Sequence, residues 1–312
     1  MDCRSSCYGF DEVGVFFDWG SLFQKPRTAP QDDAFRAALN VMSIWYAHFG
    51  TTVVVVQGQD DYLRVPRSDR GWPTFEEAMA ELLKEGNPRC PLVLHTGGTT
   101  TAFGSSTTIR QGPPRPPSQF NALIATKTFT NGADVETVKS LYLDSIVEGF
   151  GSISKVKYRQ LGWADGELSL LASSLVESGT RGRVVDLDLG GNDMASGEAL
   201  STAVAAGALV ALRNLIMDNC RRLVGLPSNL GHCRALDFCN VDHCISLDAL
   251  PDSMSECTKL RVLFIKGCPL RSVPDLNLQR PMVGGIEHES PLGRSGWGKG
   301  KFDAWRSMPA AL

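Results

Sequence analysis

The sequence LRNLIMDNC at residues 212–220 recurs as LDFCNVDHC at residues 236–244 and as LRVLFIKGC at residues 260–268. The interval between copies is 24 residues both times. Each copy begins with leucine, ends with cysteine and carries apolar residues at its fourth and sixth places, with Cys239 as the unusual member. Similarity at a fixed interval indicates a repeat architecture, in which each unit packs against the next.

An earlier and longer unit precedes these three. VVDLDLGGN at residues 184–192 fits the same pattern with asparagine in place of the final cysteine, and it begins 28 residues before the copy at 212–220. The additional length holds GEALSTAVAAGAL, which is rich in good helix formers. The later units carry Leu-Pro pairs and shorter connections. We therefore predict four stacked units, the first of them backed by a helix.

This pattern resembles that of leucine-rich repeat proteins. Each unit in that family contributes one short strand to a parallel sheet, and the apolar side chains stack between neighbouring units. The resemblance implies a short leucine-rich repeat solenoid whose concave sheet face binds another protein. Such scaffolds are reused for unrelated ligands, so the architecture implies recognition without identifying the partner.

Side chains alternate along a strand, which places the residues between the buried positions on the concave face. Three rows are expected there: Asp186, Asn214, Phe238 and Val262; Asp188, Ile216, Asn240 and Phe264; Gly190, Asp218, Asp242 and Lys266. We predict that Phe238 and Phe264 form an aromatic binding centre with acidic surroundings, since aromatic anchors commonly dominate binding energy. The alternative is that the C-terminal tail or the N-terminal domain folds over both rings.

The N-terminal third alternates between strand and helix patterns. Apolar and β-branched runs predict three buried strands, at residues 13–22, 51–56 and 91–96. Amphipathic or capped segments predict helices at residues 32–49, 74–86, 134–149 and 161–179. Thr74 is the expected N-cap of the second helix. Strands that alternate with helices predict a parallel α/β sheet.

The same third resembles part of a TIR domain, with a flavodoxin-like α/β fold. GVFFDWGSL, TTVVVV and RGWPTFEEAMAEL match successive parts of that family, and Trp72 and Glu76 match its Trp-Cys-x-x-Glu segment with Pro73 in place of cysteine. Only a dozen residues precede Val13, so the resemblance implies a partial domain. It also implies an alternative function, cleavage of nicotinamide from NAD with Glu76 as the catalytic carboxylate. The simpler alternative is a structural role for Glu76, because carboxylates are favoured in the first turn of a helix.

Charge and cysteine usage narrow the classes of function. A net charge of −3, a pI near 6.0 and dispersed basic residues give no basis for binding nucleic acid. Five of the nine cysteines fall at repeat positions and are interpreted as small buried hydrophobes, without paired zinc ligands. Neither a membrane span nor a signal peptide is recognised. We expect a cytoplasmic interaction protein that needs no metal, with NAD as a ligand only under the alternative.

Composition predicts five segments. They are a partial α/β domain (1–96), a Gly/Ser/Thr/Pro-rich linker (97–118), a helical connector and repeat cap (119–182), the repeats (183–278) and a disordered tail (279–312). The linker contains PPRPP, which could dock on an SH3-like partner or serve as a plain spacer. A further possibility is a truncated gene product whose N-terminal domain is not stable.

Overall fold

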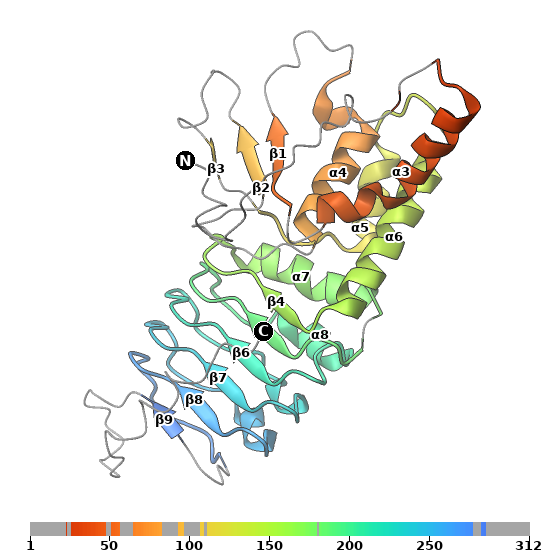
Figure 1. The fold of residues 1–312 in the computed structure, drawn as a ribbon. Coiled ribbons are helices and arrows are strands. Elements are labelled where there is room, and N and C mark those ends of the chain that lie inside the picture. The colour runs from red at the N-terminus through yellow and green to blue at the C-terminus, as the bar shows by residue number, and fades with distance from the viewer. Residues whose placement is uncertain are drawn as a thin grey trace, which may run out of the picture.

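The computed structural model describes residue 23 and residues 26–47, 51–56, 65–82, 93–96, 107–108, 111–179, 181–276 and 282–284. These residues form a mixed α/β fold with two sheets (Figure 1). A three-stranded sheet lies among helices in one half, and a six-stranded parallel sheet forms the other half. An α/β fold that contains a parallel sheet is confirmed, although the small sheet is mixed. Within the described residues, every helix is too short or too polar to cross a membrane.

The small sheet contains two predicted strands and one that was not predicted. β1 (Val53–Val56) pairs in parallel with β2 (Val93–Thr96), and β3 (Thr107–Thr108) pairs with β2 in the antiparallel direction. The first predicted helix is α3 (Ala29–Ala47). β3 was missed because it lies in the segment predicted to be a linker. The strand predicted at residues 13–22 lies outside the described residues.

Helix α4 (Gly71–Leu82) follows the short 3-10 helix η2 (Arg67–Asp69) and begins earlier than predicted. Thr74 is not its N-cap. The Thr74 hydroxyl donates to the Arg70 carbonyl (2.9 Å), four residues earlier, because Thr74 lies within the first turn of the helix. Pro73 fits in that turn because the N–H it lacks has no intrahelical acceptor there. Gly71 allows the early start, since a Cβ at this position would lie 1.9 Å from Cζ of Phe129.

Residues 111–117 are packed, which corrects the prediction of an extended, mobile linker for this part of residues 97–118. Their carbonyl groups accept hydrogen bonds from side chains of distant elements: Trp163 Nε1 to Gln111 O (2.9 Å), Ser174 Oγ to Pro114 O (2.6 Å) and Tyr142 OH to Arg115 O (2.7 Å). The four prolines of PPRPP are buried, so they are not displayed to an SH3-like partner. Proline has no N–H to satisfy, and the segment can be buried once its carbonyls have donors.

Three helices join the two halves: α5 (Pro117–Ala125), α6 (Asp134–Ser152) and α7 (Asp165–Glu177). α6 and α7 confirm the helices predicted at 134–149 and 161–179. The ring of Phe120 stacks on Tyr142 with centroids 3.8 Å apart. The Tyr158 hydroxyl donates to the Leu82 carbonyl (3.0 Å) and so ties α4 to the start of the large sheet. One buried core therefore runs through both halves.

The large sheet contains β4 (Lys155–Lys157), β5 (Asp186–Asp188), β6 (Asn214–Ile216), β7 (Phe238–Asn240), β8 (Val262–Phe264) and β9 (Met282–Gly284). Every neighbouring pair is parallel. The sheet exceeds the four predicted units by one strand at each end. β4 lies in the predicted connector, and β9 corrects the prediction of disorder for residues 282–284. Each added strand pairs with the free edge of its neighbour.

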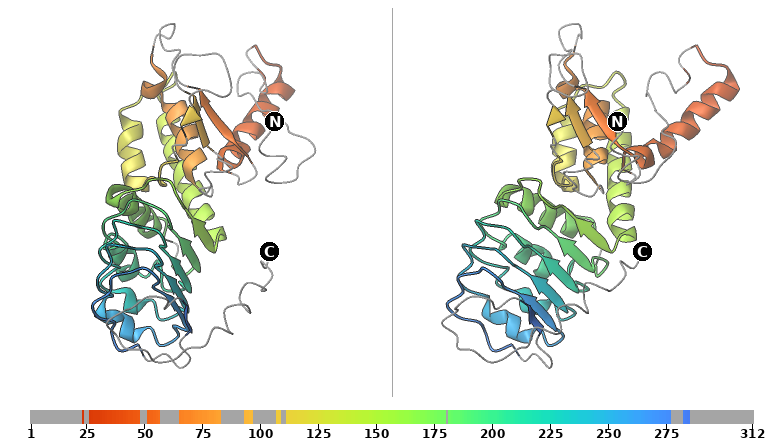
Figure 2. Two further views of the ribbon diagram at one scale, coloured as in Figure 1. Left: turned by 90° about the vertical axis from the view of Figure 1, so that its left-hand side faces the viewer. Right: turned by 60° about the vertical axis from the view of Figure 1, so that its left-hand side comes forward.

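Between successive strands of the large sheet, the chain returns along one side of the sheet and leaves the other side open to the strands' outward side chains (Figure 2). The first two return segments contain the α-helices α7 and α8 (Leu200–Ala205), and the next two contain only the short 3-10 helices η3 (Leu230–His232) and η4 (Asp252–Glu256). The helix predicted in the first repeat unit is confirmed as α8. The 24-residue intervals leave room only for short 3-10 turns, which are the tighter helical form.

The middle residue of each strand from β5 to β8 points into the core. Leu187, Leu215, Cys239 and Leu263 are in register and are at most 2% exposed. Cys239 therefore behaves as a small apolar residue in this row. Burial at 0 to 5% likewise confirms the interpretation of Cys220, Cys233, Cys244 and Cys257 as buried hydrophobes, and Cys268 is partly buried.

We call one strand with its return segment a coil. In addition to the strand pairing, hydrogen bonds from the last position of the nine-residue pattern join each coil to the one before it. Cys220, Cys244 and Cys268 donate through Sγ to carbonyls of the preceding coil, at Leu189 (3.5 Å), Met217 (3.1 Å) and Val241 (3.0 Å). Burial raises the pKa of the Cys244 thiol to about 12, which keeps its proton in place for this bond. Asn192 occupies the equivalent place in the first predicted unit and donates to the Tyr158 carbonyl (2.7 Å).

Candidate functional site

The predicted partner-binding residues lie together on one side of the large sheet, which we call the strand face. Strand register places Asp186, Asn214, Phe238 and Val262 in one row, and Asp188, Ile216, Asn240 and Phe264 in the next. All eight are partly exposed, whereas the residues between them are buried. The rows extend onto the unpredicted strand β4, where the register adds Lys155 and Lys157.

Arg159, which follows β4, organises the acidic end of the strand face. Its Nη1 contacts Oδ1 of Asp188 and Oδ1 of Asp218, both at 2.7 Å, and its Nη2 donates to Oδ2 of Asp218 (2.9 Å). Asp186 lies 3.8 Å from Nζ of Lys155 and accepts a hydrogen bond from Asn214. Three of the four aspartates predicted to form the acidic surroundings, Asp186, Asp188 and Asp218, are therefore paired with cations within the protein.

The two carboxylates that share Arg159 have opposite pKa shifts. Burial acts on both to raise the pKa, and for Asp188 it prevails over the hydrogen bond from Arg159. For Asp218 burial is outweighed by hydrogen bonds from Arg159 and Asn219, so its pKa is lowered. The difference follows from geometry, because Asp218 receives both guanidinium nitrogens and Asp188 only one.

Gly190 of the third predicted row is required by this ion-pair network. A Cβ there would lie 2.4 Å from Nη1 of Arg159 and 2.4 Å from Oδ1 of Asp218. Any other residue would push the guanidinium away from its carboxylates. Gly190 is thus a supporting position instead of a contact for a partner.

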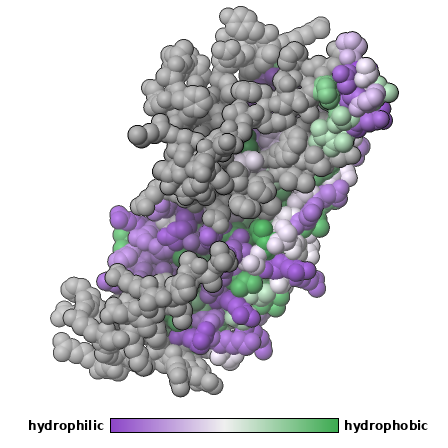
Figure 3. Space-filling model, viewed as in Figure 1, coloured by the Kyte–Doolittle hydropathy of each residue, from purple (hydrophilic) through white to green (hydrophobic). Residues whose placement is uncertain are grey.

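The centre of the strand face is apolar. The rings of Phe238 and Phe264 contact each other edge to face, with centroids 5.4 Å apart and planes at 63°. Ile216 and Val262 are partly exposed beside them. Where described residues of this half are visible in Figure 3, the surface is mostly hydrophilic with small hydrophobic areas. The two phenylalanines predicted to form the aromatic centre are therefore in contact with each other.

The other end of the third row consists of turns. Asp242 Oδ1 accepts from the Lys266 backbone N–H (2.6 Å), and Asn240 Oδ1 accepts from the Asp242 N–H (2.9 Å). The next residue of each coil has a positive φ: Gln160, Gly191, Asn219, His243 and Gly267. The prediction that His243 lies in an exposed turn is confirmed. Asp242 and Lys266 thus support turns as well as bordering the strand face.

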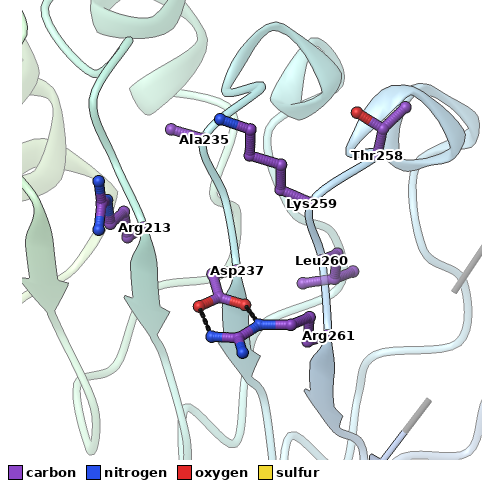
Figure 4. Close-up of a pocket in the computed structure, with 7 residues that line it drawn as sticks. All are labelled: Arg213, Ala235, Asp237, Thr258, Lys259, Leu260 and Arg261. Carbon is purple, nitrogen blue, oxygen red and sulfur yellow. Dashed lines mark hydrogen bonds and ion pairs between the residues drawn. The ribbon is translucent and has the colours of Figure 1, made fainter. Parts of the chain in front are cut away.

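A groove opens where β6, β7 and β8 begin. It is lined by Arg213, Ala235, Asp237, Thr258, Lys259, Leu260 and Arg261 (Figure 4). Sequence reasoning missed this groove, although Arg213, Asp237 and Arg261 occupy one repeat position directly before the first row. That shared position was the available signal.

Glu76, the residue predicted for NAD cleavage, lies partly buried in α4 and does not line either of the pockets identified in the described residues. The neighbouring face of α4 does line a small pocket, with Glu77 and Glu81 opposite Arg67, Arg115 and Lys127. Burial is the main cause that raises the pKa of Glu81 to about 7, and the Gly112 N–H donates to its Oε1 (3.0 Å). The carboxylate that lines this pocket with a raised pKa is therefore Glu81 and not the predicted Glu76.

Comparisons with known proteins add no assignment: no protein-family model matches the chain, and no curated protein matches it. Among the described residues, no group of three or more His, Cys, Asp or Glu side chains could hold a metal ion.

Proposed function

We propose that residues 183–278 are leucine-rich repeats and that their strand face binds another protein through Phe238 and Phe264. β4 and its return helix α7 serve as a first, atypical coil of the same stack. The protein is then an interaction module in which the helical half caps the repeats.

The recurring bonds support the repeat assignment. One position of the pattern supplies the buried strand centre, one supplies the donor to the preceding coil, and one adopts positive φ. A stack of this kind gains stability from interfaces between neighbouring coils, because a single coil cannot bury its apolar side.

The aromatic pair is the observation that carries the binding proposal. Phe238 and Phe264 lie in the apolar centre of the strand face, and the carboxylates at its acidic end, Asp188 and Asp218, are already paired with Arg159. A partner that covers the rings therefore need not break those ion pairs. Rings held on a parallel sheet also lose little conformational freedom on binding, which favours affinity.

The test is a quantitative affinity purification from native lysate with three full-length baits. They are the wild-type chain, Phe238→Ala/Phe264→Ala and the control Val224→Ala/Ile245→Ala, whose side chains are 55% and 58% exposed outside the strands. We expect proteins that the wild type and control retain and the phenylalanine variant loses. Equal recovery by all three folded baits would refute the assignment of the strand face.

A further inference from the structure

We propose that the groove before β6, β7 and β8 receives a carboxylate-rich segment of the partner, next to an apolar side chain that contacts Phe238 and Phe264. This inference rests on the proposed function and specifies the chemistry of the partner. It arises from charges that the proposed function does not use.

The strand face is balanced in formal charge. Its three rows, extended onto β4, hold four cationic residues (Lys155, Lys157, Arg159 and Lys266) and four aspartates (Asp186, Asp188, Asp218 and Asp242). Those charges give a partner no net attraction. Electrostatic recognition must therefore come from the borders of the strand face.

The groove has an excess of positive charge. Its lining includes three cations, Arg213, Lys259 and Arg261, and one carboxylate, Asp237, which Arg261 holds through two hydrogen bonds (Figure 4). Within the described residues no ion pair involves Arg213 or Lys259, and both are exposed. Two cations thus remain to bind carboxylates.

The groove and the aromatic pair adjoin. Asp237 directly precedes Phe238, and Arg261 directly precedes Val262, so one residue of extended chain, roughly 3.3 Å, separates the groove from the first row. A short peptide can therefore place acidic residues in the groove and an apolar residue on the rings at once. The apolar neighbour favours a protein segment over nucleic acid.

Charge also argues against the chain's own C-terminal tail as the occupant. Residues 285–312 contain Arg294, Lys299, Lys301 and Arg306 but only three acidic residues, Glu287, Glu289 and Asp303. A segment with excess positive charge is a poor match for a basic groove. A second molecule with acidic side chains is the better match.

The experiment measures binding of fluorescein-labelled peptides to the full chain by anisotropy. One probe alternates glutamate with two leucines at its centre, a second has lysine in place of every glutamate, and a third is an oligothymidine of the same length. We expect the glutamate peptide to bind best and to weaken about tenfold in Arg213→Glu/Lys259→Glu. The control Arg221→Glu/Arg222→Glu changes two exposed arginines beyond the other end of β6 and should bind as the wild type does.

The outcomes separate this inference from the proposed function. Loss of glutamate-peptide binding in both the groove variant and Phe238→Ala/Phe264→Ala supports both. Loss in the groove variant alone supports the acidic site and counts against the aromatic centre. Equal binding of the two peptides, no binding at about 1 mM, or tighter binding of the oligothymidine would overturn the inference. The affinity purification still tests the strand face in each of those cases.

Discussion

The coils from β5 to β8 and the segment at residues 111–117 both bury backbone carbonyl groups, but they satisfy them differently. In the coils one repeated position supplies the donor, as Cys220 and Cys244 do for the coil before them. In the segment each carbonyl has a donor of its own, such as Trp163 or Ser174. In the coils, several weak thiol bonds act together, so no single one is essential. At the junction between the halves, each buried carbonyl is satisfied by one side chain, so the loss of that side chain leaves the carbonyl without a donor.

Asn192 stands at the same repeated position as these cysteines, but three of its four bonds are to residues that follow β4. Its Oδ1 accepts from the N–H groups of Leu161 (2.9 Å) and Trp163 (3.2 Å), and its Nδ2 donates to the carbonyls of Tyr158 (2.7 Å) and Leu189 (2.8 Å). A thiol at this place could not make all four bonds. The unit that meets the helical half therefore carries asparagine where later units carry cysteine.

The largest effect is expected for Asn192→Ala. The change leaves the N–H groups of Leu161 and Trp163 and the Tyr158 carbonyl without their partner, while the Leu189 carbonyl keeps only the Cys220 thiol. Each group that stays unsatisfied costs roughly 1–3 kcal/mol. We expect a loss of about 4 kcal/mol in the free energy of unfolding, measured by urea denaturation. Asn229→Ala is the control, because it removes one hydrogen bond, to the Ser201 carbonyl. A similar loss in both variants would contradict the special role of Asn192.

Glu81 should make the junction sensitive to pH. Its pKa is raised by burial from 4.5 to about 7, so between these values the folded protein holds a proton that the unfolded chain releases. Stability from this group is complete below about pH 4.5, falls as pH rises, and levels off above pH 7. The shift corresponds to about 3 kcal/mol of unfolding free energy.

Denaturation at pH 5 and pH 8 measures this term. Glu81→Gln keeps an acceptor for the Gly112 N–H and should remove most of the decrease between the two values. Glu177→Gln changes an exposed carboxylate and should retain it. An unchanged pH dependence in Glu81→Gln would show that another group is responsible.

A smaller effect is expected for Cys244→Ala, the counterpart of Asn192→Ala in the regular coils. The change removes one sulfur atom and one hydrogen bond to the Met217 carbonyl, and we expect a loss of about 1.5 kcal/mol. Thermal or urea unfolding would measure it. A loss of stability as large as that of Asn192→Ala would contradict the difference that we infer between the four bonds of Asn192 and the single bond of Cys244.

The smallest effect is expected for Glu76→Ala, since Glu76 is partly buried and lines neither pocket. We expect its stability to change by less than about 1 kcal/mol. We also expect that neither the wild type nor the variant, at high protein concentration, consumes NAD. Chromatography would measure the remaining NAD over time. NAD loss by the wild type that disappears in Glu76→Ala would instead establish the alternative function.

The 24-residue interval was sufficient to predict the strands β6 to β8 and the two rows of residues on the strand face. A shift by one residue would turn every side chain to the opposite face, so the apolar positions fix which of Phe238 and Cys239 is exposed. The pattern also extends to residues 153–161, where Ile153, Val156 and Tyr158 fit it, but the longer interval and Leu161 at the final place concealed β4. Arg159 and its ion pairs were missed for the same reason.

The junction could not be predicted from local pattern. A run such as GPPRPP has the composition of a linker, and its burial depends on donors from Tyr142, Trp163 and Ser174, which are between 27 and 60 residues away along the chain. The groove also depends on neighbours brought together by the stack. Such features require the tertiary structure because no short segment contains both partners.

The affinity of a captured partner for the strand face tests the central proposal most directly. Titration calorimetry would compare the full-length wild type, Phe238→Ala/Phe264→Ala and Val224→Ala/Ile245→Ala at one salt concentration. We expect the dissociation constant to rise about a hundredfold for the phenylalanine variant, as for the loss of two anchor residues, and to stay within about twofold for the control. Equal affinities of wild type and a correctly folded phenylalanine variant would contradict the assignment of the strand face as the recognition surface.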